Sequence, residues 1–343
     1  MARPVAQTSI YSIAAELGVS ASMVSRALNN RSGVSEESRR KILQSMRDHG
    51  FKINYPIQHQ PRIAIVLYGP SGVGPGQAQI LTGINEYFST HNITASTVLY
   101  DPFRQASLLT QVREQQCAGI IILADMHLAS QLPELAECGL PVVTIDERPM
   151  IPGIGFVDND SYSGAFELVE YLLKLGHRKI GFLLRWPHTL NHIQRVSGYR
   201  NAMSKAGIDV PKDWIIEYQE SGAHVTSEQS GEELFLRSRK EHPDFTALVA
   251  VNDGVALGVL HAALRNGLAV PGDISIAGFD DMFFCAYTVP ELTTVFHPSR
   301  QAGSRAAHAI AKALASNGQF ELPNIILPTQ LVIRQSTGSV PAR

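Results

Sequence analysis

Residues 10–29 read IYSIAAELGVSASMVSRALN. Apolar side chains recur here at the spacing of one helix face, with Thr8 or Ser9 placed to cap the helix and Gly18 placed to end it. A second helix is predicted to open at Ser20. The two apolar stripes consist of Ile10, Ile13, Ala14 and Leu17, then Val24, Ala27 and Leu28. Two short helices joined at a glycine predict a helix-turn-helix.

A third short helix is predicted between Ser35, as its cap, and Gly50, where it ends. It has an apolar side and is surrounded by basic side chains: Ile42, Leu43 and Met46, then Arg39, Arg40, Lys41 and Arg47. Three such helices can bury one small core. The basic residues are then either the solvated surface of an ordinary helical bundle or a surface that binds a polyanion.

The outward face of the second helix favours the polyanion. It holds small, donor-rich side chains: Ala21, Ser22, Ser25, Arg26 and Asn29. Such a face can approach base-pair edges in the major groove of DNA. Ser20 and Ser25 can donate hydrogen bonds to phosphates, and the Arg26 guanidinium can reach guanine O6 and N7.

The charge of the chain is divided between its parts. The whole chain carries −2, but residues 1–60 hold eight basic and four acidic side chains, a charge of +4, and the other 283 residues carry −6. The whole-chain value therefore hides a basic amino-terminal domain, which predicts salt-dependent binding to phosphates. The negative charge of the other 283 residues favours a role for them other than binding phosphates.

Composition excludes several classes of protein. With 343 residues, 44% of them hydrophobic and 17% charged, the chain is ordinary globular material and large enough for two or three domains. No apolar run reaches the roughly 20 residues of a membrane helix, and no secretion signal is recognised, so we expect a cytoplasmic protein. Its three scattered cysteines, Cys117, Cys138 and Cys285, suggest neither disulfides nor a paired-cysteine metal site.

The amino-terminal region resembles the headpiece of the LacI/GalR (lactose/purine repressor) family. The resemblance rests on residues 11–20, on Val24-Ser25-Arg26-Ala27-Leu28-Asn29 and on Val34-Ser35, with Met23 standing where the family usually has Thr. It implies that Ala21, Ser22 and Arg26 face bases. The residues that it implies for holding the DNA backbone are Tyr11, Ser20, Ser25 and Asn29.

The segment that follows departs from that family. Members continue into a hinge helix of Ala-Arg-x-Leu type, whose Leu wedges into the minor groove and kinks the DNA. Here residues 51–61 read FKINYPIQHQP, which is shorter, lacks that pattern and is bounded by Pro56 and Pro61. Ile57 could replace the wedge or could lie exposed in an extended tether, and we expect the tether and little bending of DNA.

From residue 62 onward, short apolar runs alternate with amphipathic stretches. This alternation predicts β-α units and parallel, doubly wound sheets in two similar lobes. We expect a helix-turn-helix domain at 1–53, a linker at 54–61, a first lobe at 62–157 with about 292–322, and a second lobe at 158–291 with about 323–343. Because parallel sheets bind ligands at their carboxyl ends, a small-molecule cleft is expected between the lobes.

The resemblance extends through this core. It rests on LGHRKI at 175–180, Arg195-x-x-Gly198-Tyr199, AVND at 250–253 and IxIAGFDD at 274–281, which are similar to the effector-binding domain of the family. That domain in turn resembles periplasmic sugar-binding proteins. The resemblance implies a homodimer that binds a near-palindromic DNA operator as a repressor, responds to a carbohydrate effector and needs no cofactor.

Six side chains are the candidates for contact with the effector. Asp146 and Asp280 follow predicted strands, where side chains reach the cleft, and carboxylates, a guanidinium and an amide can bind neighbouring hydroxyls. The full set is Tyr68, Asp146, Arg195, Asn252, Asp280 and His297. Asp158 and Asp253 are weaker candidates, since both precede predicted helices and could be N-caps.

Other functions fit the sequence less well. Gly72-Val73-Gly74 begins like a dinucleotide-binding loop, but Gln77 stands where the third glycine belongs, and no Lys-Ser/Thr follows. His188 and His192 lack a third zinc ligand, and there is no Gly-x-Ser-x-Gly nucleophile motif. We therefore expect no enzyme, and a transport-binding protein would not carry a basic helix-turn-helix.

Overall fold

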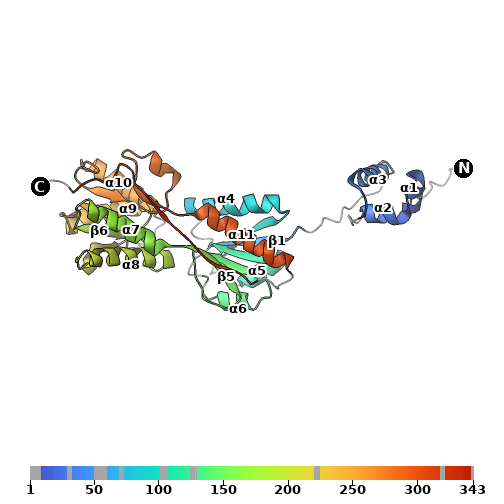
Figure 1. Cartoon of the computed structure of the whole chain (residues 1–343), viewed down its shortest axis with the longest axis horizontal. Coiled ribbons are helices and arrows are strands. Elements are labelled where there is room, and N and C mark those ends of the chain that lie inside the picture. The colour runs from blue at the N-terminus through green and yellow to red at the C-terminus, as the bar shows by residue number, and fades with distance from the viewer. Residues whose placement is uncertain are drawn as a thin grey trace. The chain divides into compact units, whose positions relative to one another are not determined.

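The structure, a computed structural model, divides into two units, Met1–Pro61 and Arg62–Arg343. It describes residues 9–28, 33–49, 60–68, 73–100, 107–123, 128, 130–219, 225–316 and 321–340, without the side chains of Leu28, Glu36, Arg47 and Tyr68. Figure 1 shows the small amino-terminal unit, which we call the headpiece, and the larger unit, which we call the core. Each is described by itself.

The headpiece is the predicted set of three helices, α1 (Ile10–Glu16), α2 (Ala21–Leu28) and α3 (Glu36–Asp48). Ser9 caps α1 in a capping box with Ser12, the Ser20 hydroxyl accepts from the Met23 amide at 3.1 Å, and the Ser35 hydroxyl accepts from the Ser38 amide at 3.2 Å. The buried core holds the predicted residues Ile13, Ala14, Val24, Ala27, Ile42 and Met46.

Polar contacts between the helices hold the headpiece together. Arg39 on α3 donates from Nη1 to the Ala27 carbonyl at 3.1 Å, close to the end of α2. Glu16, at the end of α1, accepts from the Ser45 hydroxyl at 3.1 Å and lies 3.3 Å from His49 Nε2. Because these contacts join α3 to both other helices, the headpiece is tied together despite its small core.

The first lobe of the core is a six-stranded parallel sheet in the order β11-β5-β4-β3-β1-β2. The strands are β1 (Arg62–Tyr68), β2 (Thr94–Tyr100), β3 (Gly119–Leu123), β4 (Val142–Ile145), β5 (Ile154–Asn159) and β11 (Asn324–Leu327). Its helices are α4 (Pro75–Thr90), α5 (Leu108–Glu114), α6 (Leu132–Ala136) and α11 (Ser299–Ala315). Successive side chains of a strand point to opposite faces, so Ile63 and Ile65 pack with α4 and α11 while Ala64 and Val66 pack with α5 and α6.

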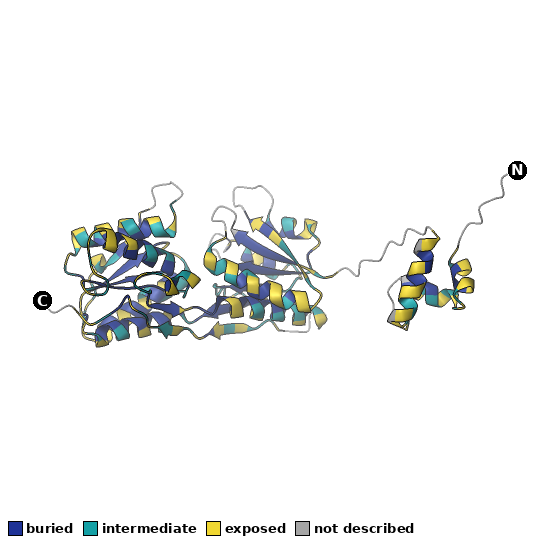
Figure 2. Ribbon diagram, turned by 90° about the horizontal axis from the view of Figure 1, so that it is seen from above, coloured by how far each residue is buried: buried dark blue, intermediate teal, exposed yellow. Residues whose placement is uncertain are grey.

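The second lobe is a four-stranded parallel sheet in the order β7-β6-β8-β9. The strands are β6 (Ile180–Leu184), β7 (Ile215–Glu217), β8 (Ala247–Ala250) and β9 (Ser275–Ala277). The helices, which pack as the pairs α7–α8 and α9–α10, are α7 (Ser161–Lys174), α8 (Leu190–Lys205), α9 (Ser227–Glu241) and α10 (Asp253–Arg265). Figure 2 shows buried strands inside each lobe and helices with exposed outer sides.

The chain passes between the lobes at three places. It leaves the first sheet after Asn159, returns to it between β10 (Thr294–Phe296) and α11, and crosses again between β11 and β12 (Gln330–Val332). β10 and β12 pair antiparallel, and Figure 1 shows these long segments running from one lobe to the other. The two lobes are therefore joined by three crossing segments of the chain.

The structure bears out the predicted fold class and differs in three details. Helix α11 was not predicted, although its residues Ala302, Ala306 and Ile310 complete the first core. Strand β11 pairs with β5 in the first sheet, whereas residues from about 323 onward were expected in the second lobe. The division at 157/158 also differs, because Asp158 and Asn159 still belong to β5.

Three further expectations bear on the chain as a whole. Among the residues described, no helix is long and apolar enough to cross a membrane. Cys117, Cys138 and Cys285 are free thiols. The linker, apart from its last two residues, lies outside the described residues, and so does the first half of the glycine-rich loop that follows β1.

Candidate functional sites

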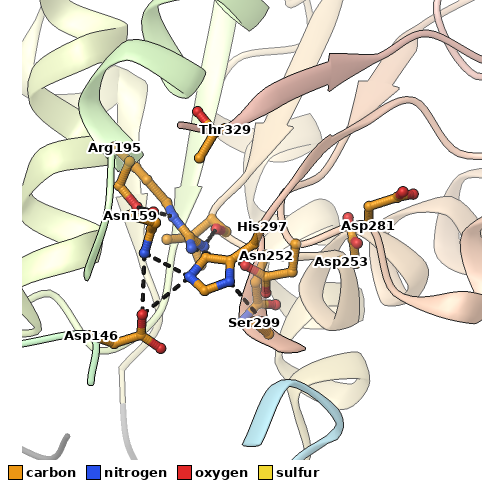
Figure 3. A network of polar contacts seen from close by, with 12 residues as sticks. Asp146, Asn159, Arg195, Asn252, Asp253, Asp281, His297, Ser299 and Thr329 are labelled. Carbon is orange, nitrogen blue, oxygen red and sulfur yellow. Dashed lines mark hydrogen bonds and ion pairs between the residues drawn. The ribbon is translucent and has the colours of Figure 1, made fainter. Parts of the chain in front are cut away.

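A cluster of polar side chains lies between the lobes, at the carboxyl ends of their strands. Asp146 follows β4, Asn159 ends β5 and His297 follows β10, while Arg195 comes from α8 (Figure 3). Asp280 follows β9. The structure thus brings together four of the six expected residues. We call the five residues together the cleft cluster.

Asp146 is held by two neighbours. Asn159 donates from Nδ2 to Asp146 Oδ1 at 3.2 Å, and His297 Nε2 lies 3.2 Å from the same oxygen (Figure 3). Burial would raise the pKa of Asp146, but the charge and hydrogen bond of His297, helped by Arg195, outweigh burial and lower that pKa. Asp146 is therefore an ionised carboxylate at neutral pH.

His297 has two competing partners at Nε2. This nitrogen also lies 2.6 Å from Asn159 Nδ2, while Nδ1 lies 2.7 Å from the Ser299 hydroxyl. With a proton on Nε2 the ring donates to Asp146, and without one it accepts from Asn159. Burial lowers the pKa of His297, but Asp146 and Asp280 together outweigh burial and raise it, which favours the charged ring.

Arg195 uses its whole guanidinium group inside the second lobe. It donates from Nη1 to the Val251 carbonyl at 2.7 Å, from Nη2 to Asp280 Oδ1 at 2.9 Å and from Nε to the Ser161 hydroxyl at 3.3 Å. Its Cζ atom lies 3.7 Å from the centre of the Phe279 ring. Arg195 is thus a fixed support for Asp280.

The two carboxylates share a local geometry. Asp146 has a φ of +62° and Asp280 a φ of +116°, both in the left-handed region that few residues other than glycine adopt. Their side chains keep about a quarter of their surface exposed, at 26% and 24%, whereas those of Arg195 and His297 are 5% exposed. An incoming ligand therefore meets carboxylate oxygens first, with the cations behind them. Burial raises the pKa of Asp280, and the Arg195 charge opposes that rise.

The sequence did not predict the contact that Arg148 makes between the two lobes. This residue follows β4 in the first lobe and donates from Nε to Asp158 Oδ2 at 2.5 Å and from Nη2 to the Asn159 carbonyl at 3.0 Å. Nη2 also lies 3.5 Å from Gln194 Oε1 on α8 of the second lobe. The nearby Asp146 could have drawn attention to Arg148, but its reach to Gln194 depends on tertiary structure.

The capping hypotheses for Asp158 and Asp253 are wrong, because neighbours cap both helices. Asp160 caps α7 through the Ser163 amide at 3.0 Å, and Asn252 caps α10 through the Val255 amide at 2.9 Å. The side-chain oxygen of Asn252 is thus already hydrogen-bonded to the backbone, which makes Asn252 a weaker candidate for contact with the effector.

Asp253 is a buried link between loops. It accepts from the Thr294 hydroxyl at 2.6 Å and from the Met282 amide at 2.8 Å. Burial, followed by the charge of Asp280, raises the pKa of Asp253 to about 7. Asp253 is fully buried, so its part is to hold the loop that carries Asp280.

Two other candidates fall partly outside the structure. Tyr68 ends β1, but its side chain is not among those described. In the glycine-rich loop, Gln77 accepts from the Gly74 amide at 3.0 Å and so caps α4 instead of leaving room for a pyrophosphate. Within the described ranges there is no group of metal-ligating side chains, and His192 is buried against the Trp186 carbonyl at 3.0 Å.

The headpiece presents a separate candidate surface. Tyr11 on α1 is 76% exposed, and Ser22 and Arg26 on α2 are exposed. Arg26 Nη2 lies 3.1 Å from the Ser22 hydroxyl, so the two side chains form one unit.

The remaining candidates of this surface are less open. The Ser20 hydroxyl oxygen accepts a hydrogen bond that caps α2, and Ser25 is half-buried. Ala21, expected to face outward, is half-buried against the core, as is Met23. Asn29 lies outside the described residues.

Two family models match the chain. Residues 9–54 match the model of bacterial regulatory proteins of the lacI family, and residues 169–337 match a periplasmic binding protein-like domain. The first match falls on the headpiece, and the second covers most of the second lobe together with α11 and β11 of the first lobe.

Curated relatives span the whole chain. The NTD biosynthesis operon regulator NtdR of Bacillus subtilis (strain 168) is 29% identical over 335 residues, which cover 96% of this chain and 99% of that protein. The HTH-type transcriptional regulator GalR of Escherichia coli (strain K12) is 28% identical over 345 residues, 97% of this chain and 96% of that protein.

Solved structures share the fold. The lac repressor dimer bound to operator and an anti-inducer has a TM-score of 0.75 at 23% identity and covers 96% of this chain and 99% of its own. A complex of the transcriptional regulator CelR with cellobiose has a TM-score of 0.72 at 22% identity and covers 96% of this chain and 100% of its own. With its helix-turn-helix headpiece, two-lobed core and matching relatives, the chain belongs to the lacI family of bacterial regulatory proteins, which are DNA-binding transcriptional regulators and not enzymes.

Proposed function

We propose that this chain is a cytoplasmic repressor that binds a near-palindromic operator as a homodimer and is controlled by a carbohydrate bound between the lobes of its core. The observation that carries the proposal is the cleft cluster, in a chain that also has a lacI-type headpiece. Two solved structures of similar fold are complexes of regulators with cellobiose and with ribose, which supports a carbohydrate for this chain as well.

The chemistry of the cleft suits hydroxyl groups. Asp146 and Asp280 each use Oδ1 for a protein partner, which leaves Oδ2 as an acceptor for a ligand donor. Ionised carboxylates make stronger hydrogen bonds than neutral acceptors. Because Arg195 and His297 lie behind the carboxylates and are already engaged, a polyol suits the site better than a phosphate or a carboxylic acid.

The headpiece would place α2 in the major groove. In this proposal Ser22 and Arg26 contact bases, Ala21 gives at most a contact with a thymine methyl, and Tyr11 holds the backbone. Ser20, Ser25 and Asn29 complete the backbone contacts. The headpiece charge of +4 would add a salt-dependent, sequence-independent share of the affinity.

Effector binding would act through the crossovers. Asn159 and His297 belong to the cleft cluster and also lie where the chain passes between lobes. A ligand that draws Asp146 and Asp280 together would change the angle between the lobes and hence the spacing of two headpieces in a dimer. A coupling of about 1–3 kcal/mol, or 5–150-fold in affinity, is the usual scale.

The test has two measurements on one preparation. An operator is first selected from random duplex DNA, and its affinity for the full chain is measured by fluorescence anisotropy. A panel of sugars, sugar phosphates and nucleobases is then screened by thermal shift and by the change in operator affinity. We expect a neutral sugar to raise the unfolding temperature and to alter operator affinity.

The controls separate the two halves of the proposal. Asp280→Ala should keep operator binding and lose the response to the sugar. Failure to select any operator would contradict the regulator, whereas selection of an operator with no sugar response in the wild type would contradict the carbohydrate effector alone.

A further inference from the structure

A tryptophan stands at the carboxyl end of β6, outside the cleft cluster. Trp186 comes two residues after Leu184, the last residue of the strand, and is 41% exposed. Its φ is +53°, in the left-handed region that a bulky side chain rarely adopts. An exposed aromatic residue held in a strained backbone needs a physical reason.

Arg185 supports one side of the indole ring. Its Cζ atom lies 3.9 Å from the Trp186 ring centre and 5.7 Å from that of Tyr218. Nη2 of Arg185 donates to the Val225 carbonyl at 2.6 Å and Nη1 to the Ser227 hydroxyl at 3.3 Å. The guanidinium is thereby anchored at the start of α9, so the ring rests on a fixed support.

His192 holds the backbone of the same residue. Its Nδ1 lies 3.0 Å from the Trp186 carbonyl, and its ring lies nearly parallel to the indole, at 13°. Burial, followed by the charge of Arg195, lowers the pKa of His192 to about 4, so the imidazole is neutral and its Nδ1–H can donate to the carbonyl. Two buried side chains thus fix the ring and the main chain of Trp186.

Trp186 lies at the same edge of the second sheet as Asp280 of the cleft cluster. β6 and β9 run parallel in one sheet, so the residues that follow them, Trp186 and Asp280, emerge at the same edge. His192, against Trp186, and Arg195, against Asp280, are three residues apart and therefore on the same face of α8. Between them in sequence, Gln194 lies within reach of Arg148 from the first lobe.

We propose that Trp186 is an aromatic platform of the effector site, on which the apolar C–H face of a pyranose or similar neutral ring stacks while its hydroxyls reach Asp146 and Asp280. The other tryptophan, Trp214, is half-buried and packs edge-on against Phe245, with ring centres 5.6 Å apart. This inference rests on the proposed function and adds the shape of the ligand: a ring with one apolar face.

The sequence makes the direct test simple, because the chain has only two tryptophans. In Trp214→Phe, all tryptophan fluorescence comes from Trp186. The probes are glucose, galactose, cellobiose and ribose, measured by emission spectrum and acrylamide quenching. A sugar that raises the unfolding temperature should shift the emission of Trp214→Phe to shorter wavelength and protect it from acrylamide, and should leave Trp186→Phe unchanged.

Affinity gives the second readout. Trp186→Gly permits the left-handed backbone, so we expect it to stay folded and to bind the operator as the wild type does while its sugar affinity falls by about tenfold. Trp186→Phe should keep most of the affinity. Ile193→Ala, which removes a 49% exposed side chain beside His192, is the matched control and should bind sugar normally.

The outcomes are distinguishable. If a sugar binds the wild type and Trp186→Gly with equal affinity, or leaves the fluorescence of Trp214→Phe unchanged, the platform is wrong and the carbohydrate effector stands. If no ring compound stabilises the wild type, both are overturned. A lower unfolding temperature in Trp186→Gly with unchanged sugar affinity would assign Trp186 a structural role only.

Discussion

The headpiece and the cleft place similar side chains in opposite surroundings. Arg26 is exposed and donates to the Ser22 hydroxyl one turn away, whereas Arg195 is buried and contacts residues from three other segments of the core. A surface arginine can be removed without harm to the fold, but a buried one leaves its carboxylate without a partner. Arg26 therefore serves binding alone, whereas Arg195 serves binding and stability together.

The largest effect is expected in the cleft. Arg195→Ala removes the ion-pair partner of Asp280 and three hydrogen bonds, so we expect about 3 kcal/mol lower stability toward urea and no response to effector. Arg200→Ala, which trims an exposed arginine of the same helix, should change stability by less than about 0.5 kcal/mol. If the two variants were equally stable, Arg195 would not contribute to the stability of the core.

The headpiece should show the opposite pattern. Arg26→Ala is expected to cost about 1–3 kcal/mol of operator affinity, to relax specificity at one base pair and to leave the unfolding temperature unchanged. Lys41→Ala removes the same charge from α3, where Lys41 pairs with the exposed Glu37, and serves as the control. Unaltered specific binding by Arg26→Ala would show that α2 is not the recognition helix.

A smaller effect is expected from pH. Because the folded protein raises the pKa of His297, the charged ring stabilises the fold below the unfolded pKa, 6.5, and that contribution is lost as pH rises through the folded value. Urea unfolding of wild type and His297→Gln should therefore differ progressively less as pH rises above 6.5. A difference that does not depend on pH would mean that the ring stays neutral and accepts from Asn159.

The smallest effect concerns the DNA itself. The linker lacks the Leu wedge, so we expect little bending of the operator, measured by gel mobility of permuted sites. A chimera that carries an Ala-Arg-x-Leu helix in place of residues 54–61 provides the positive control. A large bend by the natural chain would show that Ile57 or another residue replaces the wedge.

The sequence predicted well what depends on neighbours along the chain. Ser9 and Ser35 cap helices where expected, and the alternating apolar runs became the strands of both sheets. Asp146, Arg195, Asp280 and His297 meet as predicted, because parallel strands deliver their carboxyl ends to one edge.

What the sequence did not predict depends on tertiary contacts. Periodicity does not reveal that Arg148 reaches Gln194 in the other lobe, or that Asn252 and Asp160, and not the aspartates beside them, cap their helices. Helix α11 was missed although its alanines fill the space next to α4. There Gly303 lies so close to α4 that a Cβ atom would stand 2.1 Å from the Ile80 carbonyl oxygen.

The late arrival of α11 and β11 has a consequence for synthesis on the ribosome. The headpiece is complete within the first 61 residues, but the first lobe lacks Ala306, Ile310 and Leu327 from its core until the chain has grown past residue 327. At about 5–20 residues per second, that interval lasts tens of seconds. A nascent chain therefore holds a finished DNA-binding domain beside a half-built, apolar effector domain, and a chaperone has that interval in which to shield it.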